Sequence, residues 1–233
     1  MDQSKKLWLI GIVLISRTVF AILVQGSISL VTNLSFLEAG RWWTVYGSLI
    51  DICCFILLLW VFRKDGISFR SVINFNKQEF KRDLKRAGIL FVIIIPLTVV
   101  WGNVMSYLLF GNPEAPIVAG PLPLWAALYS VIIWPIGWAI IEQVIYMGYS
   151  LPSLEKLFKN KTLAITIVMF FWAIQHIALP VTLNLEYSTY RFLTVLPMVI
   201  MPIAFFKTKR LFPLILVHAV SDMISSITFY FMP

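Results

Sequence analysis

The chain has 233 residues, of which 60% are hydrophobic and only 13% are charged, and its formal net charge is +8. Soluble domains are about 45–50% apolar and about 25% charged, so this composition excludes an ordinary soluble protein and indicates a polytopic membrane protein. The apolar runs are continuous rather than alternating, which argues against a transmembrane β-barrel.

Seven stretches of the sequence are long and apolar enough to be membrane-spanning helices. They are predicted at residues 7–31, 42–62, 88–110, 123–151, 162–179, 190–206 and 211–231. The predicted fold is therefore all-α: a polytopic transmembrane helical bundle of about seven spans. We expect a single membrane-embedded domain over residues 1–233.

The basic residues indicate how this bundle is oriented. Most of the 19 Lys and Arg residues lie in alternate connections, which are the N-terminus, 63–87, 152–161 and 207–210. Basic loops stay on the cytoplasmic side, so the N-terminus is predicted to be cytoplasmic and the C-terminus to lie outside. The positive charge then reflects topology and contact with membrane lipid, and no nucleic-acid partner is expected.

Two charged residues lie inside the first two spans. Arg17 is about ten residues from the inner end of its span and Asp51 about nine from the outer end of the next, so at 1.5 Å per residue both lie roughly 15 Å deep. Antiparallel neighbours would bring them together. A structural ion pair is favoured over a functional role, because nothing else ionisable lies near them in sequence.

Three later spans carry ionisable residues of a different kind. The only two histidines of the chain, His176 and His218, lie in apolar spans, and Glu142 is a lone carboxylate in another. Ionisable groups at membrane depth are costly and normally face a protein interior, where they mark a functional site. Asp222 follows His218 by four residues, so the carboxylate lies on the same helix face and can orient the imidazole.

Other residues of these spans are expected to support the three groups. Tyr146 lies one turn after Glu142 and Trp172 one turn before His176, although plain packing is an alternative role for both aromatic residues. Pro135 and Gly137 should bend the fourth span beside Glu142. We expect Glu142, His176 and His218 to converge on one cavity that opens toward the cytoplasmic half of the membrane.

The polar residues fall into three short segments, EQVIYMG (142–148), WAIQH (172–176) and HAVSD (218–222). In this order they resemble the EExxxR, FxxxH and HxxxN/D motifs of the CAAX-prenyl protease and bacteriocin-processing (CPBP, Abi-type) family of intramembrane endopeptidases. The resemblance covers roughly residues 120–231, the predicted motif-bearing catalytic core. Residues 1–110 match only as helices and are predicted to be accessory spans.

The resemblance implies a role for each polar group. Glu142 would be the base that activates water, and His176 and His218 would orient that water and stabilise the oxyanion, with Asp222 orienting His218. The sequence departs from the family at Gln143, which replaces the second Glu of the motif. It departs again at Met147, which replaces the Arg. Both members of an i, i+4 pair are changed together, which is typical of a neutralised support pair.

The function implied by the resemblance is hydrolysis of a peptide bond in a hydrophobic or lipid-anchored peptide. The eukaryotic branch of the family removes CAAX tripeptides, but the short chain favours a bacterial relative that acts on leader peptides or in bacteriocin self-immunity, so a bacterial cell membrane is expected. Two alternatives stay open: an inactive membrane scaffold or self-immunity protein, and a proton-coupled transporter. No cofactor is expected, and zinc at Glu142, His176, His218 and Asp222 is the lesser alternative.

Overall fold

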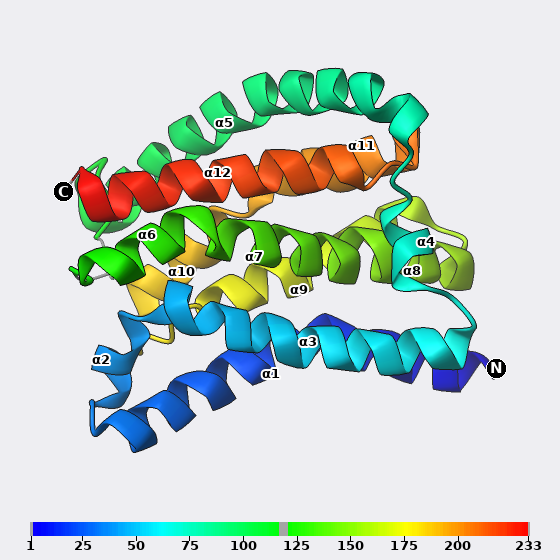
Figure 1. Cartoon of the computed structure of the whole chain (residues 1–233). Helices are drawn as coiled ribbons and strands as arrows, with labels where there is room; N and C mark the ends of the chain where they lie inside the picture. The colour runs from blue at the N-terminus through cyan, green and yellow to red at the C-terminus, as the bar shows by residue number, and fades with distance from the viewer. Residues whose placement is uncertain (1, 117–120, 233) are drawn as a thin grey trace.

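The computed structural model describes residues 2–116 and 121–232, and every regular element in this part of the chain is helical (Figure 1). The first half contains α1 (Gln3–Thr32), α2 (Phe36–Gly40), α3 (Trp43–Asp65), α4 (Phe69–Ile73), η1 (Lys77–Glu79) and α5 (Phe80–Phe110). The second half contains α6 (Leu124–Ile132), α7 (Trp134–Gln143), η2 (Val144–Ser150), α8 (Leu151–Phe158), α9 (Lys161–Ile177), α10 (Leu185–Leu193), η3 (Leu196–Val199), α11 (Ile200–Thr208) and α12 (Phe212–Phe231).

The helices form the predicted membrane bundle. By length and composition, six helical segments are long and apolar enough to cross a membrane; they are Gln3–Thr32, Trp43–Asp65, Phe69–Phe110, Leu124–Phe158, Leu185–Thr208 and Phe212–Phe231. The apolar helix α9 is shorter and takes the place of the span predicted at 162–179. The all-α polytopic fold is therefore confirmed, and the count of about seven spans is close to the observed number.

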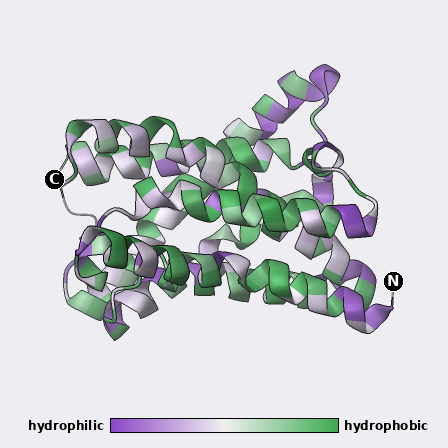
Figure 2. Cartoon of the chain, turned by 60° about the horizontal axis from the view of Figure 1, so that its bottom comes forward, coloured by the Kyte–Doolittle hydropathy of each residue, from purple (hydrophilic) through white to green (hydrophobic). Residues whose placement is uncertain are grey.

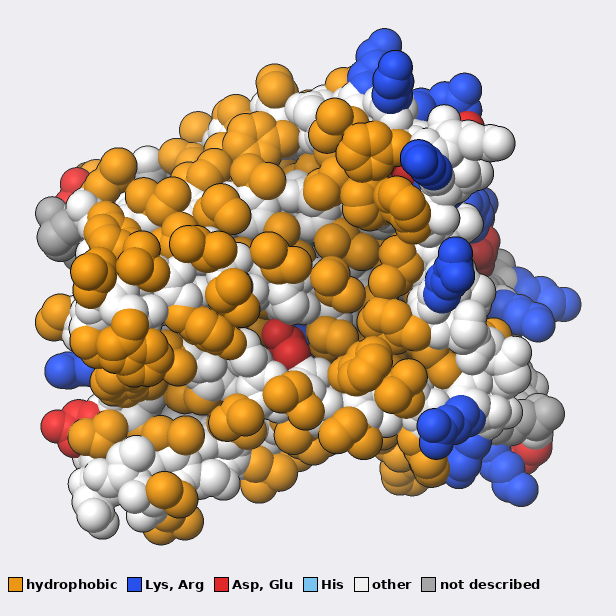
Figure 3. Space-filling model, in the orientation of Figure 1, with side chains coloured by type: hydrophobic (Ala, Val, Ile, Leu, Met, Phe, Trp, Pro, Cys, Tyr) orange, Lys and Arg blue, Asp and Glu red, His pale blue; other side chains and the backbone are white. Residues whose placement is uncertain are grey.

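The long helices lie side by side, with the two chain termini at opposite ends of the bundle (Figure 1). Lysine and arginine side chains gather along the end that carries the N-terminus, while apolar side chains cover most of the face between the two ends, where an acidic side chain is also visible (Figure 3). Hydrophilic residues likewise concentrate toward the helix ends and hydrophobic ones along their middles (Figure 2). This distribution matches a protein that spans a bilayer with its basic end in the cytoplasm.

The helix that leads to Glu142 is irregular on both sides of that residue. α6 gives way to α7 at Ile133, just before Pro135, which has no N–H with which to continue the helical hydrogen-bond series. Directly after Gln143 the chain enters the π-helical segment η2, a geometry that occurs often at functional sites. Glu142 therefore lies at the C-terminal end of the short helix α7, between the helix break at Ile133 and the π-helical segment η2.

A glycine in η2 permits close packing at the basic end. A Cβ on Gly148 would lie 2.5 Å from Cγ1 of Val72 and 3.1 Å from Cδ2 of Leu211. Only a residue without a side chain leaves room for these neighbours, as expected for a glycine at a close helix approach. Val72 and Leu211 therefore pack closely against η2 on the basic side of Glu142.

Candidate active site

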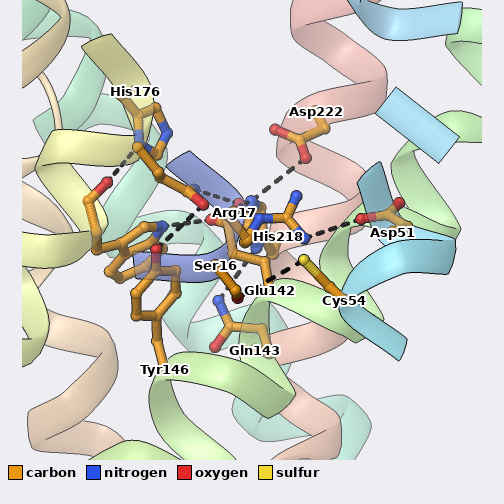
Figure 4. Close-up of polar contacts among 12 residues, drawn as sticks. Ser16, Arg17, Asp51, Cys54, Glu142, Gln143, Tyr146, His176, His218 and Asp222 are labelled. Atoms are coloured by element: carbon orange, nitrogen blue, oxygen red, sulfur yellow. Dashed lines mark hydrogen bonds and ion pairs between the residues drawn. The ribbon is translucent and has the colours of Figure 1, made fainter. Parts of the chain in front are cut away.

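Glu142 is fully buried where α7, α9 and α12 meet, and both of its carboxylate oxygens are held (Figure 4). The indole Nε1 of Trp172 donates a hydrogen bond to Oε1, and the amide Nε2 of Gln175 donates one to Oε2. Both donors come from one face of α9, because positions three residues apart share a face. A carboxylate buried in this way is fixed in one orientation and one rotamer.

His218 lies between two carboxylates. Its Nε2 is 3.6 Å from Oε1 of Glu142 and 3.3 Å from Oδ2 of Asp222, one turn further along α12. On the other side of the ring, Nδ1 is 3.1 Å from the amide Nε2 of Gln143. Because that amide nitrogen can only donate, Nδ1 is the acceptor and the proton of the neutral imidazole lies on Nε2, facing the carboxylates.

His176 has the opposite tautomer. Its Nδ1 is 2.8 Å from the backbone carbonyl of Trp172, and a carbonyl oxygen can only accept. The proton therefore lies on Nδ1, and Nε2 keeps a free lone pair. The two histidines thus offer different groups, an N–H from His218 and an acceptor nitrogen from His176.

Tyr146 and Trp172 do more than pack. The Tyr146 hydroxyl donates to Oε1 of Gln175 at 3.2 Å, so the Gln175 amide turns its nitrogen toward Glu142. The Tyr146 ring also stacks on Trp172, with ring centroids 5.8 Å apart. Tyr146 therefore orients both side chains that hold the Glu142 carboxylate.

A cavity of about 330 Å³ adjoins this cluster. Trp172, His176, His218 and Asp222 all line it, whereas Glu142 lies behind the rings of Trp172 and His218. The sequence-predicted groups Glu142, His176, His218 and Asp222 are therefore brought together around one space. Of these, Glu142 is the one set back from the cavity surface.

The cavity lies in the half of the bundle opposite the basic segments, whereas it was expected to open toward the half that carries them, the predicted cytoplasmic half. Its walls are completed by Ala115 and Pro116, by Leu179 and Pro180, and by the outer halves of α5, α10 and α12, all at the end opposite the basic segments. The reason lies in the packing: η2 fills the inner half with buried side chains such as Tyr146 and Met147. On the outer side the short α9 ends at Ile177 and leaves room.

Two residues of the cluster were missed or only partly interpreted from the sequence. Gln175 precedes His176 directly, and an amide inside an apolar span was the signal that could have identified it. Arg17 forms the predicted pair with Asp51, at 2.8 Å, but its Nε also lies 3.5 Å from Oε2 of Glu142. The contact between Arg17 and Glu142 could not be predicted from sequence spacing, because it joins distant parts of the chain.

The four residues named for the zinc alternative lie near one cavity but are not arranged to bind one metal ion. Within residues 2–116 and 121–232, no group of three or more His, Cys, Asp or Glu side chains is arranged to hold a metal ion. The Nδ1 of His176 is directed at a backbone carbonyl instead. That the site works without a cofactor stays a prediction.

Comparison with known proteins bears on the same residues. A family model described as "Type II CAAX prenyl endopeptidase Rce1-like" matches residues 121–224, which include all three polar motifs. Over those residues the chain is similar to this family. The resemblance predicted from the motifs is thereby confirmed, and the site lies in a multi-pass membrane protein whose residues 121–224 match the model of a protease family. No curated protein and no solved structure matches the chain.

The Rce1-like region supplies α7, α9 and α12, and with them the glutamate, both histidines and Asp222. Arg17 and Asp51 lie outside it, on α1 and α3. The site described here is therefore assembled from the matched region together with the long helices α1 and α3.

Proposed function

We propose that this protein is an intramembrane endopeptidase that hydrolyses a peptide bond with a water activated by Glu142. The observation that carries the proposal is the arrangement around His218 Nε2, 3.6 Å from the Glu142 carboxylate and 3.3 Å from Asp222, at the wall of the cavity. The Rce1-like match over residues 121–224 makes peptide hydrolysis the chemistry to expect from such a cluster.

The role proposed for each polar side chain follows from which of its atoms carries a proton and which can accept one. Glu142 takes a proton from water, and the resulting hydroxide adds to the carbonyl carbon of the substrate. The Nε2–H of His218 donates to the oxyanion that forms, and Asp222 keeps that ring in place. The free Nε2 of His176 accepts a hydrogen bond from the attacking water. When the C–N bond breaks, Glu142 returns its proton to the leaving amine.

The substrate is proposed to be a hydrophobic or lipid-anchored peptide that reaches the site from the outer half of the membrane. Apolar side chains such as Val99, Tyr190 and Phe229 line the cavity together with polar ones such as Thr98, Arg191 and Ser225. The apolar part of this lining suits a hydrophobic peptide segment, and the polar groups can bind its backbone. In a bacterial cell membrane, leader peptides of exported proteins would meet these requirements.

The test is cleavage of a quenched hydrophobic peptide by the purified protein in lipid vesicles. Wild type should cleave it, Glu142→Gln should not, and Glu155→Gln is the matched control because Glu155 lies at the basic end, in contact with Lys161 and Lys209. Chelators should leave the rate unchanged. Absence of cleavage by wild type with both plain and lipidated peptides would instead support the inactive scaffold or self-immunity protein.

A further inference from the structure

Arg17 is a buried cation between two carboxylates. Its guanidinium Nη1 donates to Oδ1 of Asp51 at 2.8 Å, and its Nε lies 3.5 Å from Oε2 of Glu142. The face of the guanidinium covers the ring of Trp138, with Cζ 3.9 Å from the ring centroid. Arg17 and Glu142 are both 0% exposed, so solvent screens neither charge.

An ion pair between Arg17 and Asp51 that only stabilised the fold would not need a contact between Arg17 and Glu142. Asp51 alone would neutralise Arg17, yet the guanidinium is shared with the carboxylate of the proposed base. The two direct hydrogen-bond donors to Glu142, Trp172 and Gln175, are uncharged. Within the described ranges, Arg17 is the one lysine or arginine in ion-pair contact with Glu142, and an arginine stays charged at every working pH.

Arg17 also lies close to the motif in which this chain departs from the family. The family motif has an arginine where this chain has Met147, which is buried in the apolar packing of η2. The cation in contact with Glu142 comes from α1, outside the matched residues 121–224. Arg17 does not line the cavity, so a peptide bound there would not touch it.

We propose that Arg17 is a positioning residue that keeps Glu142 ionised and directed toward His218, a role carried by the first helix of the chain. The proposal rests on the function proposed above, because only a working base needs to be held in its charged form. It goes beyond the ion pair with Asp51, which by itself would only stabilise the α1–α3 contact.

The decisive variant is the neutral pair Arg17→Gln with Asp51→Asn. It removes both charges together, so neither is left buried without its partner and the bundle should fold, unlike Arg17→Gln alone. If Arg17 serves only Asp51, this double variant should cleave peptide like wild type. If Arg17 positions Glu142, kcat should fall by about tenfold or more, a part of the roughly 10²–10⁴-fold that a general base contributes, while KM changes little.

The pH profile separates a lost charge from a loosened fold. Without Arg17, the Glu142 carboxylate holds its proton more tightly, so the acidic limb of the profile should move to higher pH. Arg17→Lys, which keeps a cation, should restore part of kcat and of the profile. The other charged or titratable groups around Glu142 come from α3, η2, α9 and α12, and they are Asp51, Tyr146, His176, His218 and Asp222.

A second buried pair provides the control. Arg210 donates from Nε to both carboxylate oxygens of Asp83, at 3.2 and 3.1 Å, at the basic end of the bundle. Arg210→Gln with Asp83→Asn should cost similar stability but leave kcat and the pH profile at wild-type values. Equal loss of kcat in both neutral pairs would mean that the effect is general destabilisation and would overturn the proposal.

The proposal also has a test that does not depend on turnover. Infrared titration of the carboxyl C=O band, assigned by its loss in Glu142→Gln, reports whether Glu142 is protonated. In wild type Glu142 should be ionised at neutral pH, and in the Arg17→Gln, Asp51→Asn variant it should stay protonated to higher pH. An unchanged titration refutes the role of Arg17, whereas a shifted titration in a protein without peptidase activity refutes only the proposed function.

Discussion

At the scale of single residues, the side chain of Gln143 contacts other groups than the glutamate of the family motif does. The family motif pairs a glutamate here with an arginine four residues later, whereas the Gln143 amide of this chain contacts Nδ1 of His218 and Sδ of Met201. A neutral donor at this point leaves the Nε2 proton of His218 facing Glu142 and Asp222. The departure from the motif therefore changes how the histidine is held.

Replacing Gln143 by glutamate should be damaging. A carboxylate cannot donate to Nδ1, so His218 would have to move its proton to Nδ1 and withdraw it from the two carboxylates. We expect Gln143→Glu to lower kcat by roughly tenfold or more, the scale of one misdirected catalytic hydrogen bond. Steady-state kinetics on the peptide substrate measures this.

Adding Met147→Arg should recover folding better than it recovers kcat. The new cation offers the buried carboxylate a partner, and the double variant should express better than either single change. The donor to Nδ1 is still missing. Wild-type kcat in the double variant would contradict the role given to the Gln143 amide.

Trp172 provides a second prediction at this scale. Trp172→Phe keeps an aromatic ring against Tyr146 but removes the N–H donor to the buried Glu142, which should destabilise the protein by about 1.5–3 kcal/mol. Trp134→Phe is the matched control, because Nε1 of Trp134 has no hydrogen-bond partner among the described residues. Thermal unfolding in detergent compares the two, and equal losses would contradict a special role for the Trp172 donor.

At the scale of elements, the packing of η2 depends on Gly148. Gly148→Ala should destabilise the bundle by about 1–3 kcal/mol, because the added methyl group overlaps Val72. Shortening the neighbour, with Val72→Ala in the same chain, should recover part of the loss. Gly88→Ala is the control, since a Cβ there meets nothing within 4 Å. Thermal unfolding distinguishes the three variants.

The elements also show what the sequence could and could not predict. Hydropathy located the spans because each must cover about 30 Å of hydrocarbon, whatever its neighbours. The π-helical segment after Gln143 was not predicted, because periodicity does not distinguish one widened turn from a regular one. The four predicted site residues lie close together, because ionisable groups buried in a membrane protein need polar partners. The contact of Arg17 with Glu142 depends on which helices become neighbours.

At the scale of the whole molecule, the cavity lies in the half of the bundle away from the basic end, and the positive-inside rule predicts that the basic end is cytoplasmic. In a variant without Cys53 and Cys54, a cysteine at Ser225, which lines the cavity, should react with a membrane-impermeant thiol reagent added outside intact cells. Ser153 lines a second cavity at the basic end, beside Lys64 and Lys156. A cysteine at this position should react only after the cells are opened. Reaction of the Ser225 cysteine only in opened cells would place the cavity on the cytoplasmic side.

The shared guanidinium of Arg17 has a consequence for biosynthesis. Arg17 enters the membrane with the first helix, and at about 5–20 residues per second Glu142 follows on the order of ten seconds later. An arginine at mid-membrane costs about 2.5–3.5 kcal/mol on insertion scales, so the nascent first helix needs a partner at once. Asp51, on the next long helix, is the first carboxylate at a suitable depth. The hairpin of α1 and α3 is thus the earliest unit that can leave the translocation machinery with its charges matched, ready to receive the glutamate when α7 is made.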